Sequence, residues 1–134
     1  MTPFLLDTNI IVDALRKRND RHLLVERLLE QGQPLASCPI TLTEVYAGMR
    51  PHEEKPTRPF MKSLLFLSIT EEIAEHAGDL KAQYARRGRS LSFQDVSIAA
   101  VSIAHGCTLV TENAKDFPMP ELQIYPLPKK QALR

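Results

Sequence analysis

The sequence of 134 residues has no tryptophan, only two cysteines, and few aromatic residues, which make up 6% of the chain. Cys38 and Cys107 lie far apart and fit no metal-binding spacing, so we expect buried thiols in a reducing compartment. No apolar run approaches the roughly 20 residues that a membrane span needs. No basic segment precedes the N-terminal apolar run, which argues against a secretory signal. We therefore expect a cytoplasmic protein without membrane contact.

The sequence also lacks an excess of charge of either sign. It has 17 Lys and Arg residues against 16 Asp and Glu residues, a formal net charge of +1. This balance gives no global electrostatic case for binding nucleic acid, so such binding would need a local basic patch. A glycine-rich loop ending in Gly-Lys is absent, which excludes a P-loop nucleotide binder. The length predicts a single domain over residues 1–134 with enough chain for a core.

Short apolar runs alternate with amphipathic segments along the chain. We predict strands over residues 3–6, 35–38, 67–69, 107–110 and 122–125. We predict helices over residues 9–18, 21–32, 41–49, 60–66, 71–88 and 92–106, a proline-rich loop over 50–59, and a flexible tail over 126–134. The alternation predicts an α/β fold whose parallel sheet is covered on both faces and whose strands end at one ligand-binding edge.

Three acidic residues occupy comparable junctions between strands and helices. Asp7 follows the first strand in FLLDTNIIVDAL, Glu44 lies in TLTE after the second, and Asp95 lies in SFQD at the start of the helix before the fourth. Each carboxylate could instead only stabilise the N-terminus of its own helix. Thr41 with Glu44 has the spacing of a capping box, Ser92 with Asp95 has nearly the same device, and Asp7 could accept from backbone donors.

The predicted topology, however, brings the three junctions to one edge of the sheet. Carboxylates that converge there repel one another and raise each other's pKa, so the cluster is costly unless a cation holds it together. Mg²⁺ or Mn²⁺ suits all-oxygen ligands, and such an ion can activate water and neutralise charge on a phosphodiester. A further position, Asn113, follows Thr111 at the end of the fourth strand, where an ordinary turn is the alternative.

The segments LLDTNIIVDAL, TLTEVYAGM and FQDVSIAAVSIAHGCTLVTENAKDF resemble the PIN-domain ribonucleases, specifically the VapC toxins of bacterial toxin–antitoxin pairs. The resemblance extends over nearly the whole chain, and the order and spacing of the motifs agree. It implies a PIN-like three-layer α/β/α fold with a central parallel five-stranded sheet. It also implies a Mg²⁺-dependent endoribonuclease that acts on structured RNA, either tRNA or rRNA, and is held inactive by a VapB-type antitoxin. Homodimers are common in the family.

Carried over by position, the resemblance implies that Asp7, Glu44 and Asp95 are the catalytic acids. Asp7 and Asp95 would be direct metal ligands, and Glu44 would reach the metal through water or orient the attacking water. Thr8 and Asn9 match the family's DTN signature. We expect Thr8 to form a hydrogen bond within the site and Asn9 to support the loop that carries Asp7.

By the same resemblance, the fourth acidic position of many PIN domains falls near Asn113, where this chain carries an amide without negative charge. Asn113 can still coordinate through its oxygen, but the number of metal ions, one or two, stays open. Glu112 and Asp116 are candidates to replace the missing acid, and Thr111 is a supporting residue. The implied reaction is an in-line attack of water that leaves a 5′-phosphate and a 3′-hydroxyl.

Basic residues beside these motifs are candidates for RNA contact. The segment ARRGR contributes Arg86, Arg87 and Arg89, and Lys115 lies in the turn near Asn113. The alternatives are interaction with a helix dipole and ordinary solvation. Surplus aliphatic residues on the first two helices, such as Leu23, could form a groove for an antitoxin helix.

Other functions fit the sequence less well. A haloacid-dehalogenase-type phosphatase needs a second aspartate two residues after the first, and that position is Asn9. A receiver domain would place an aspartate after the third strand, where LSIT ends in Thr70. A PIN-like module that binds RNA or protein but cuts weakly remains the non-enzymatic alternative, because Asn113 replaces an acid.

Overall fold

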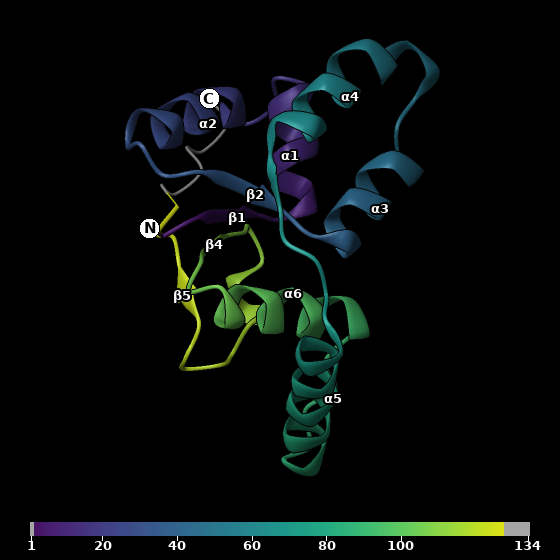
Figure 1. Ribbon diagram of the computed structural model, residues 1–134, viewed down its shortest axis with the longest axis vertical. Helices are drawn as coiled ribbons and strands as arrows, with labels where there is room; N and C mark the ends of the chain where they lie inside the picture. Colours follow the sequence, from purple (N-terminus) through teal and green to yellow (C-terminus); the bar gives the residue numbers. More distant parts are fainter. Residues whose placement is uncertain (1, 128–134) are drawn as a thin grey trace, which may run out of the picture.

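A computed structural model describes residues 2–127 as a three-layer α/β fold around a five-stranded, all-parallel sheet (Figure 1). The strand order is β3-β2-β1-β4-β5. The strands are β1 (Phe4–Leu6), β2 (Leu35–Ser37), β3 (Leu65–Phe66), β4 (Thr108–Val110) and β5 (Gln123–Ile124). The three residues of β1 and of β2 are all buried, as expected where helices cover both faces of a parallel sheet. The predicted fold class is confirmed.

Helices lie on both sides of the sheet, with α1, α2 and α4 on one side and α5 and α6 on the other (Figure 1). The helices are α1 (Thr8–Leu15), α2 (Arg21–Glu30), α3 (Pro39–Ala47), α4 (Glu54–Ser63), α5 (Glu71–Arg86) and α6 (Phe93–Ala104), with 3₁₀ helices η1 (Pro51–Glu53) and η2 (Ala114–Asp116). α3 contacts both α1 and α6, so it connects the two helical layers.

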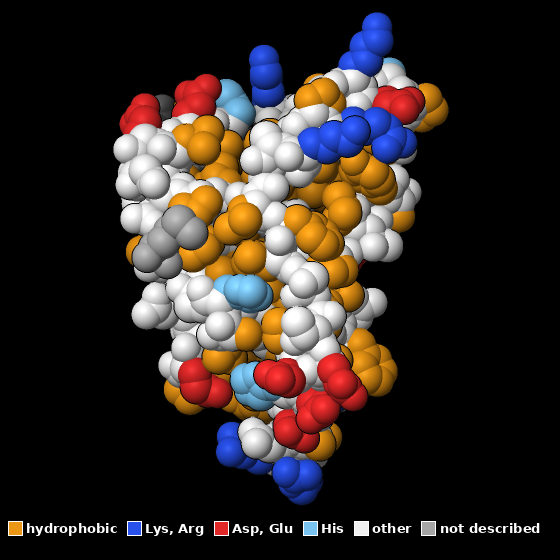
Figure 2. Space-filling view, viewed as in Figure 1, with side chains coloured by type: hydrophobic (Ala, Val, Ile, Leu, Met, Phe, Trp, Pro, Cys, Tyr) orange, Lys and Arg blue, Asp and Glu red, His pale blue; other side chains and the backbone are white. Residues whose placement is uncertain are grey.

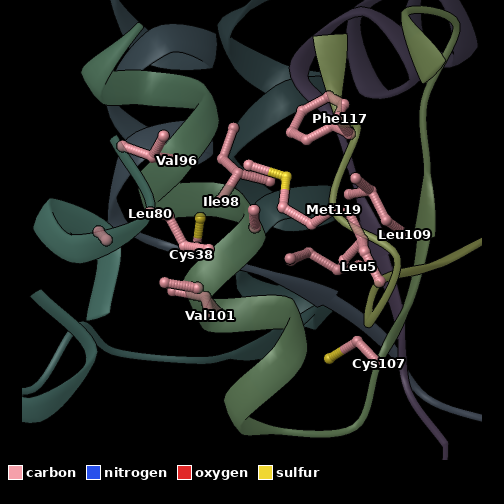
Figure 3. Close-up of a cluster of buried hydrophobic side chains, with 14 of the residues drawn as sticks. Leu5, Cys38, Leu80, Val96, Ile98, Val101, Cys107, Leu109, Phe117 and Met119 are labelled. Atoms are coloured by element: carbon pink, nitrogen blue, oxygen red, sulfur yellow. The ribbon is translucent and has the colours of Figure 1, made fainter. Parts of the chain in front are cut away.

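The core forms two clusters, one on each face of the sheet, because successive strand side chains point to opposite faces. Leu5 joins the cluster under α5 and α6, whereas Phe4 and Leu6 join the cluster under α1 and α2. Figure 3 shows the first cluster, in which Cys38 and Cys107 lie among aliphatic side chains. Both cysteines are buried free thiols, as predicted, and burial raises the pKa of Cys107 to about 11.

The segment predicted as a loop over residues 50–59 is helical, and that prediction was wrong. It forms η1 and the first part of α4. Pro56 lies in the first turn of α4, where a helix needs no backbone donor, and only Pro59 lies in the interior. Thr57 and Met61, one turn apart, are buried and fix the helix against the core. Tertiary packing therefore outweighs the proline content.

Several boundaries differ from the sequence-based predictions. The predicted helix over residues 60–66 is wrong at its end, because α4 ends at Ser63 and Leu65–Phe66 form β3. The third strand is Leu65–Phe66 rather than residues 67–69, and α3 begins at Pro39 rather than at residue 41. The first helix ends at Leu15 because a turn with positive φ at Lys17, Asn19 and Asp20 follows it. The predicted flexible tail lies almost entirely outside the described residues. No helix within residues 2–127 has the length and apolarity of a membrane span.

Candidate active site

The order in which strands are added to the sheet reverses at its centre, next to β1, and this position is the switch point of the sheet. From β1 the chain builds β2 and β3 on one side and β4 and β5 on the other. Ligands in such sheets bind at the carboxyl ends of the strands where the order reverses. Asp7 follows β1 at this point, and its backbone N–H donates to the carbonyl of Val110 at 2.9 Å. Thr111 follows β4 and therefore lies beside Asp7.

Both carboxylate oxygens of Asp7 accept hydrogen bonds. Oδ1 accepts from the backbone N–H of Thr8 at 2.8 Å, so Asp7 caps α1 as the structural alternative predicted. Oδ2 accepts from the hydroxyl of Thr111 at 2.7 Å. Thr111 is 2% exposed, and its oxygen accepts from the backbone N–H of Asn113 at 3.0 Å. These bonds fix the orientation of the Asp7 carboxylate, which retains further lone pairs for a ligand.

Glu44 lies in the second turn of α3, because this helix begins at Pro39. The proposed capping box with Thr41 does not form: Cys38 is the N-cap residue, and the hydroxyl of Thr41 is buried 3.6 Å from the Cys38 sulfur. Glu44 instead accepts a hydrogen bond at Oε1 from the hydroxyl of Thr8 at 2.8 Å. Thr8 thus connects the first acidic motif to the second.

Asp95 lies in the first turn of α6, whose N-cap is Ser92. The Ser92 hydroxyl oxygen accepts from the Asp95 backbone N–H at 3.0 Å. Burial raises the pKa of Asp95, the side-chain hydrogen bond with Ser92 opposes this, and the nearby charges of Asp116, Asp7 and Glu44 raise it further. The net effect is a raised pKa, and the charges of the other three carboxylates contribute to it.

We call Asp7, Glu44, Asp95 and Asp116 the acidic cluster. Among residues 2–127 the ion pairs are Arg16–Glu53, Arg21–Glu112 and Arg58–Glu54. None of these pairs involves a member of the acidic cluster, so the described residues leave its charge uncompensated. Uncompensated carboxylates that approach one another favour an external cation.

Of the two acids considered as replacements at the fourth position, only Asp116 belongs to this cluster. Glu112 accepts from Nε of Arg21 at 2.8 Å, and Arg21 is only 6% exposed. No local sequence pattern indicates this ion pair, since 91 positions separate the two residues. Asn113 forms the turn before η2, where its carbonyl accepts from the Asp116 N–H at 2.8 Å.

The chemistry of these donors fits a hard divalent cation, although the side chains form no ready-made cage. Within residues 2–127, no three Asp, Glu, His or Cys side chains are grouped closely enough to hold a metal ion by themselves. Mg²⁺ typically takes one or two carboxylates and completes its shell with water and substrate phosphates. Asp7 and Asp95 can fill that role. The metal-binding role of Asp7, Glu44 and Asp95 stays a prediction, as do the roles of Asn9 and Asn113.

Two of the basic residues predicted to contact RNA, Arg87 and Arg89, have partners within the chain. The guanidinium of Arg87 lies over the ring of Tyr84, 5.3 Å from its centroid, and Arg89 donates to the backbone carbonyl of Lys115. The second contact ties η2 to the chain that follows α5. On the face in Figure 2, Lys and Arg side chains gather over α4 and at the far end of α5. RNA contact by Arg86, Arg87, Arg89 and Lys115 stays a prediction.

Comparisons with known proteins find similar proteins over most of the chain. The family model of the PIN domain matches residues 4–118. Ribonuclease VapC19 of Mycobacterium tuberculosis is 33% identical over 120 residues, which cover 89% of this chain and 96% of that protein. The tRNA(fMet)-specific endonuclease VapC of Shigella flexneri is 31% identical over 124 residues, which cover 87% of this chain and 91% of that protein.

The fold is also similar to that of solved toxin–antitoxin structures. The crystal structure of VapBC2 from Rickettsia felis bound to a DNA fragment from their promoter aligns with a TM-score of 0.80 and 25% identity, covering 92% of this chain and 98% of that chain. The span matched by the family model contains every member of the acidic cluster. The two hydroxyls that hold Asp7 and Glu44 also lie within it.

Proposed function

The chain belongs to the PIN-domain family and, within it, to the VapC group, and we propose that it is a Mg²⁺- or Mn²⁺-dependent endoribonuclease toxin. The observation that carries this proposal is the acidic cluster. Burial and the charges of Asp116, Asp7 and Glu44 raise the pKa of Asp95, and no described ion pair compensates these four carboxylates. Structural acids in the same chain, such as Glu53 and Glu112, do have cationic partners.

Asp7 and Asp95 would hold the cation, and a bound cation would activate water and neutralise charge on the phosphodiester. Thr111 keeps the Asp7 carboxylate in one orientation through its 2.7 Å hydrogen bond. Thr8 does the same for Glu44, which we assign to orienting the attacking water and accepting its proton. Water then adds to phosphorus, the bond to the 3′-oxygen breaks, and the products carry a 5′-phosphate and a 3′-hydroxyl.

The substrate class that we propose is structured RNA, either tRNA or rRNA. One relative is named as a tRNA(fMet)-specific endonuclease, which makes tRNA the first substrate to examine. We also propose a VapB-type antitoxin as partner and a homodimer as the assembled form, since VapBC complexes are among the similar structures. Leu23 and Leu29 of α2, which are 47% and 56% exposed, offer apolar surface to an antitoxin helix.

The test is cleavage of a panel of tRNA and rRNA by the purified chain with Mg²⁺, Mn²⁺ or a chelator. We expect cleavage only with the divalent ion. Asp7→Asn should abolish it while the thermal unfolding curve stays cooperative. Asp79→Asn, which removes an exposed carboxylate from α5 outside the acidic cluster, is the matched control and should cut like the wild type. Equal cleavage by wild type and Asp7→Asn would disprove the assignment.

The second candidate is a PIN-like module that binds RNA or protein but cuts weakly, since Asn113 stands where many relatives have an acid. The same panel separates the two functions. Binding without cleavage under every divalent ion would favour the module. Cleavage that disappears in Asp7→Asn would exclude it.

A further inference from the structure

Phe93 is the most exposed large hydrophobic side chain of the described residues, with 71% of its surface accessible. It is the first residue of α6 and precedes Asp95, a member of the acidic cluster, by two positions. Both chain neighbours, Ser92 and Gln94, are exposed and polar. Single exposed apolar residues are common on proteins, so exposure alone assigns no role to this ring.

A second observation concerns what holds the ring. Nζ of Lys81, on α5, lies 4.8 Å from the centroid of the Phe93 ring. The same ammonium group donates to the backbone carbonyl of Leu91, whose side chain is buried between the two helices. Lys81 therefore has a defined position against one face of the ring. Because the side chain is largely exposed, the other face is open to solvent.

An exposed aromatic face two residues along α6 from a proposed metal ligand suits a nucleobase. Every base has a π-face, and stacking on an aromatic side chain needs only one ring. A protein partner would instead require a contiguous apolar patch, which the polar neighbours Ser92 and Gln94 do not provide. A base can reach such a ring only if it is unpaired, since bases in a duplex are already stacked on one another.

We propose that Phe93, backed by Lys81, is a stacking platform for an unpaired nucleobase next to the phosphodiester that is cut. This proposal rests on the proposed function for the identity of the substrate as RNA. It deepens that function, because it predicts that the chain acts on single-stranded or loop segments rather than on paired ones. It also gives the ammonium of Lys81 a second role, as a cation near the RNA backbone.

The absence of tryptophan from the sequence allows a direct binding test. Phe93→Trp introduces the chain's single tryptophan, which is excited at wavelengths that tyrosine does not absorb, and it is combined with Asp7→Asn so that RNA stays intact. We expect a short oligoadenylate to quench its emission. The matching duplex and an oligoribonucleotide without bases should quench it weakly. The matched control is Leu29→Trp in the same Asp7→Asn background. Leu29 is also exposed but lies on α2, so RNA should not quench the emission of this tryptophan.

Kinetics supply the second readout. Phe93→Ala and Phe93→Leu should raise KM by about tenfold, which is within the range found when base-stacking aromatics are truncated. The value of kcat should change little, because the ring lies outside the reacting groups. Phe93→Tyr should restore the wild-type KM, and Lys81→Gln should raise KM by less than Phe93→Ala does.

The outcomes separate this proposal from the proposed function. Cleavage by the wild type with an unchanged KM in Phe93→Ala would overturn the platform alone. Equal quenching by the base-free chain would overturn it as well, since only phosphate would then be bound. Emission that changes with protein concentration in the absence of RNA would assign the ring to contact between copies. Failure of the wild type to cut any RNA would instead count against the proposed function, and the platform would then fail unless oligoadenylate still quenched the emission.

Discussion

The carboxylates of Glu53 and Asp95 occupy opposite electrostatic environments in the same fold. Glu53 accepts from the guanidinium of Arg16 at 2.7 and 3.0 Å and from the backbone N–H of Arg50 at 2.9 Å. These bonds, that to Arg16 most of all, lower the pKa of Glu53 to about 2. Asp95 is half-buried, and its pKa is raised by this burial and by the charges of Asp116, Asp7 and Glu44.

The difference separates acids that form ion pairs within the fold from acids for which the described residues provide no ion pair. Glu53 joins η1 to the end of α1, and Glu112 joins the chain after β4 to the start of α2 through Arg21. In both cases the cation comes from the protein. For the acidic cluster no described ion pair supplies a cation, which is why we place the proposed chemistry there and assign the paired acids to stability.

The largest effect should come from removing one charge of the acidic cluster. Asp95→Asn should lower kcat/KM by about a thousandfold or more, because the cation loses a ligand and charge stabilisation worth several kcal/mol. The fold should be unharmed or slightly more stable in chelator, since a repelled charge is gone. RNA cleavage and thermal unfolding measure the two effects. A cleavage-competent Asp95→Asn variant would contradict the assignment.

The second largest effect on cleavage should come from removing the Thr111 hydroxyl, which orients Asp7. Thr111→Val removes the donor to Asp7 and the acceptor for the Asn113 backbone. We expect about 10–100-fold lower activity, as for other groups that orient metal ligands. Higher Mg²⁺ concentrations should recover part of the loss, and Thr111→Ser should restore it. An unchanged Mg²⁺ dependence in Thr111→Val would show that this hydroxyl does not position the ligand.

Asp116 and Glu112 offer a matched comparison four positions apart. Asp116→Asn removes charge that Asp95 experiences, so we expect about tenfold weaker cleavage, the lower end of the range for groups around a metal site. Glu112→Gln should cut normally but unfold more easily, by about 1–3 kcal/mol, because the buried Arg21 loses its charged partner. Steady-state cleavage and urea unfolding distinguish the two variants. The reverse pattern would mean that Glu112 is the functional acid.

The smallest effect should appear in the pH dependence of stability. The folded-state pKa of Glu53 is about 2 against an ordinary 4.5, so its contribution is complete above pH 4.5 and disappears as the pH falls towards 2. Glu53→Gln should therefore unfold more easily than the wild type at neutral pH, with cleavage unchanged. Urea unfolding at a series of pH values should show the two curves converging at the acidic end. A gap that stays constant with pH would exclude this ion pair as its cause.

The sequence predicted the parts of the structure that depend on local patterns and on sheet topology. The prediction of Asp7, Glu44 and Asp95 at one edge follows from parallel strands all ending there; in the structure, burial and the charges of Asp116, Asp7 and Glu44 raise the pKa of Asp95. The position of Glu44 within α3 was missed, because TLTE imitates a capping box while Cys38 and Pro39 begin the helix.

Other features depend on contacts that no local pattern contains. Helix α4 forms despite its prolines because Thr57 and Met61 are buried against the core. The pairing of Arg21 with Glu112 follows only from the packing of α2 beside the end of β4. Without knowledge of that ion pair, the segment TENAKDF does not indicate which of its two acids, Glu112 or Asp116, affects the pKa of Asp95.

The most direct test of the account is the thermal stability of the wild type and Asp95→Asn during titration with Mg²⁺ and with Mn²⁺. A cation that binds only the folded protein raises the unfolding temperature in a saturable way. The account predicts such a rise for the wild type and little or none for Asp95→Asn, which should start from an equal or higher unfolding temperature in chelator. Identical responses of the two proteins to the cation would contradict it.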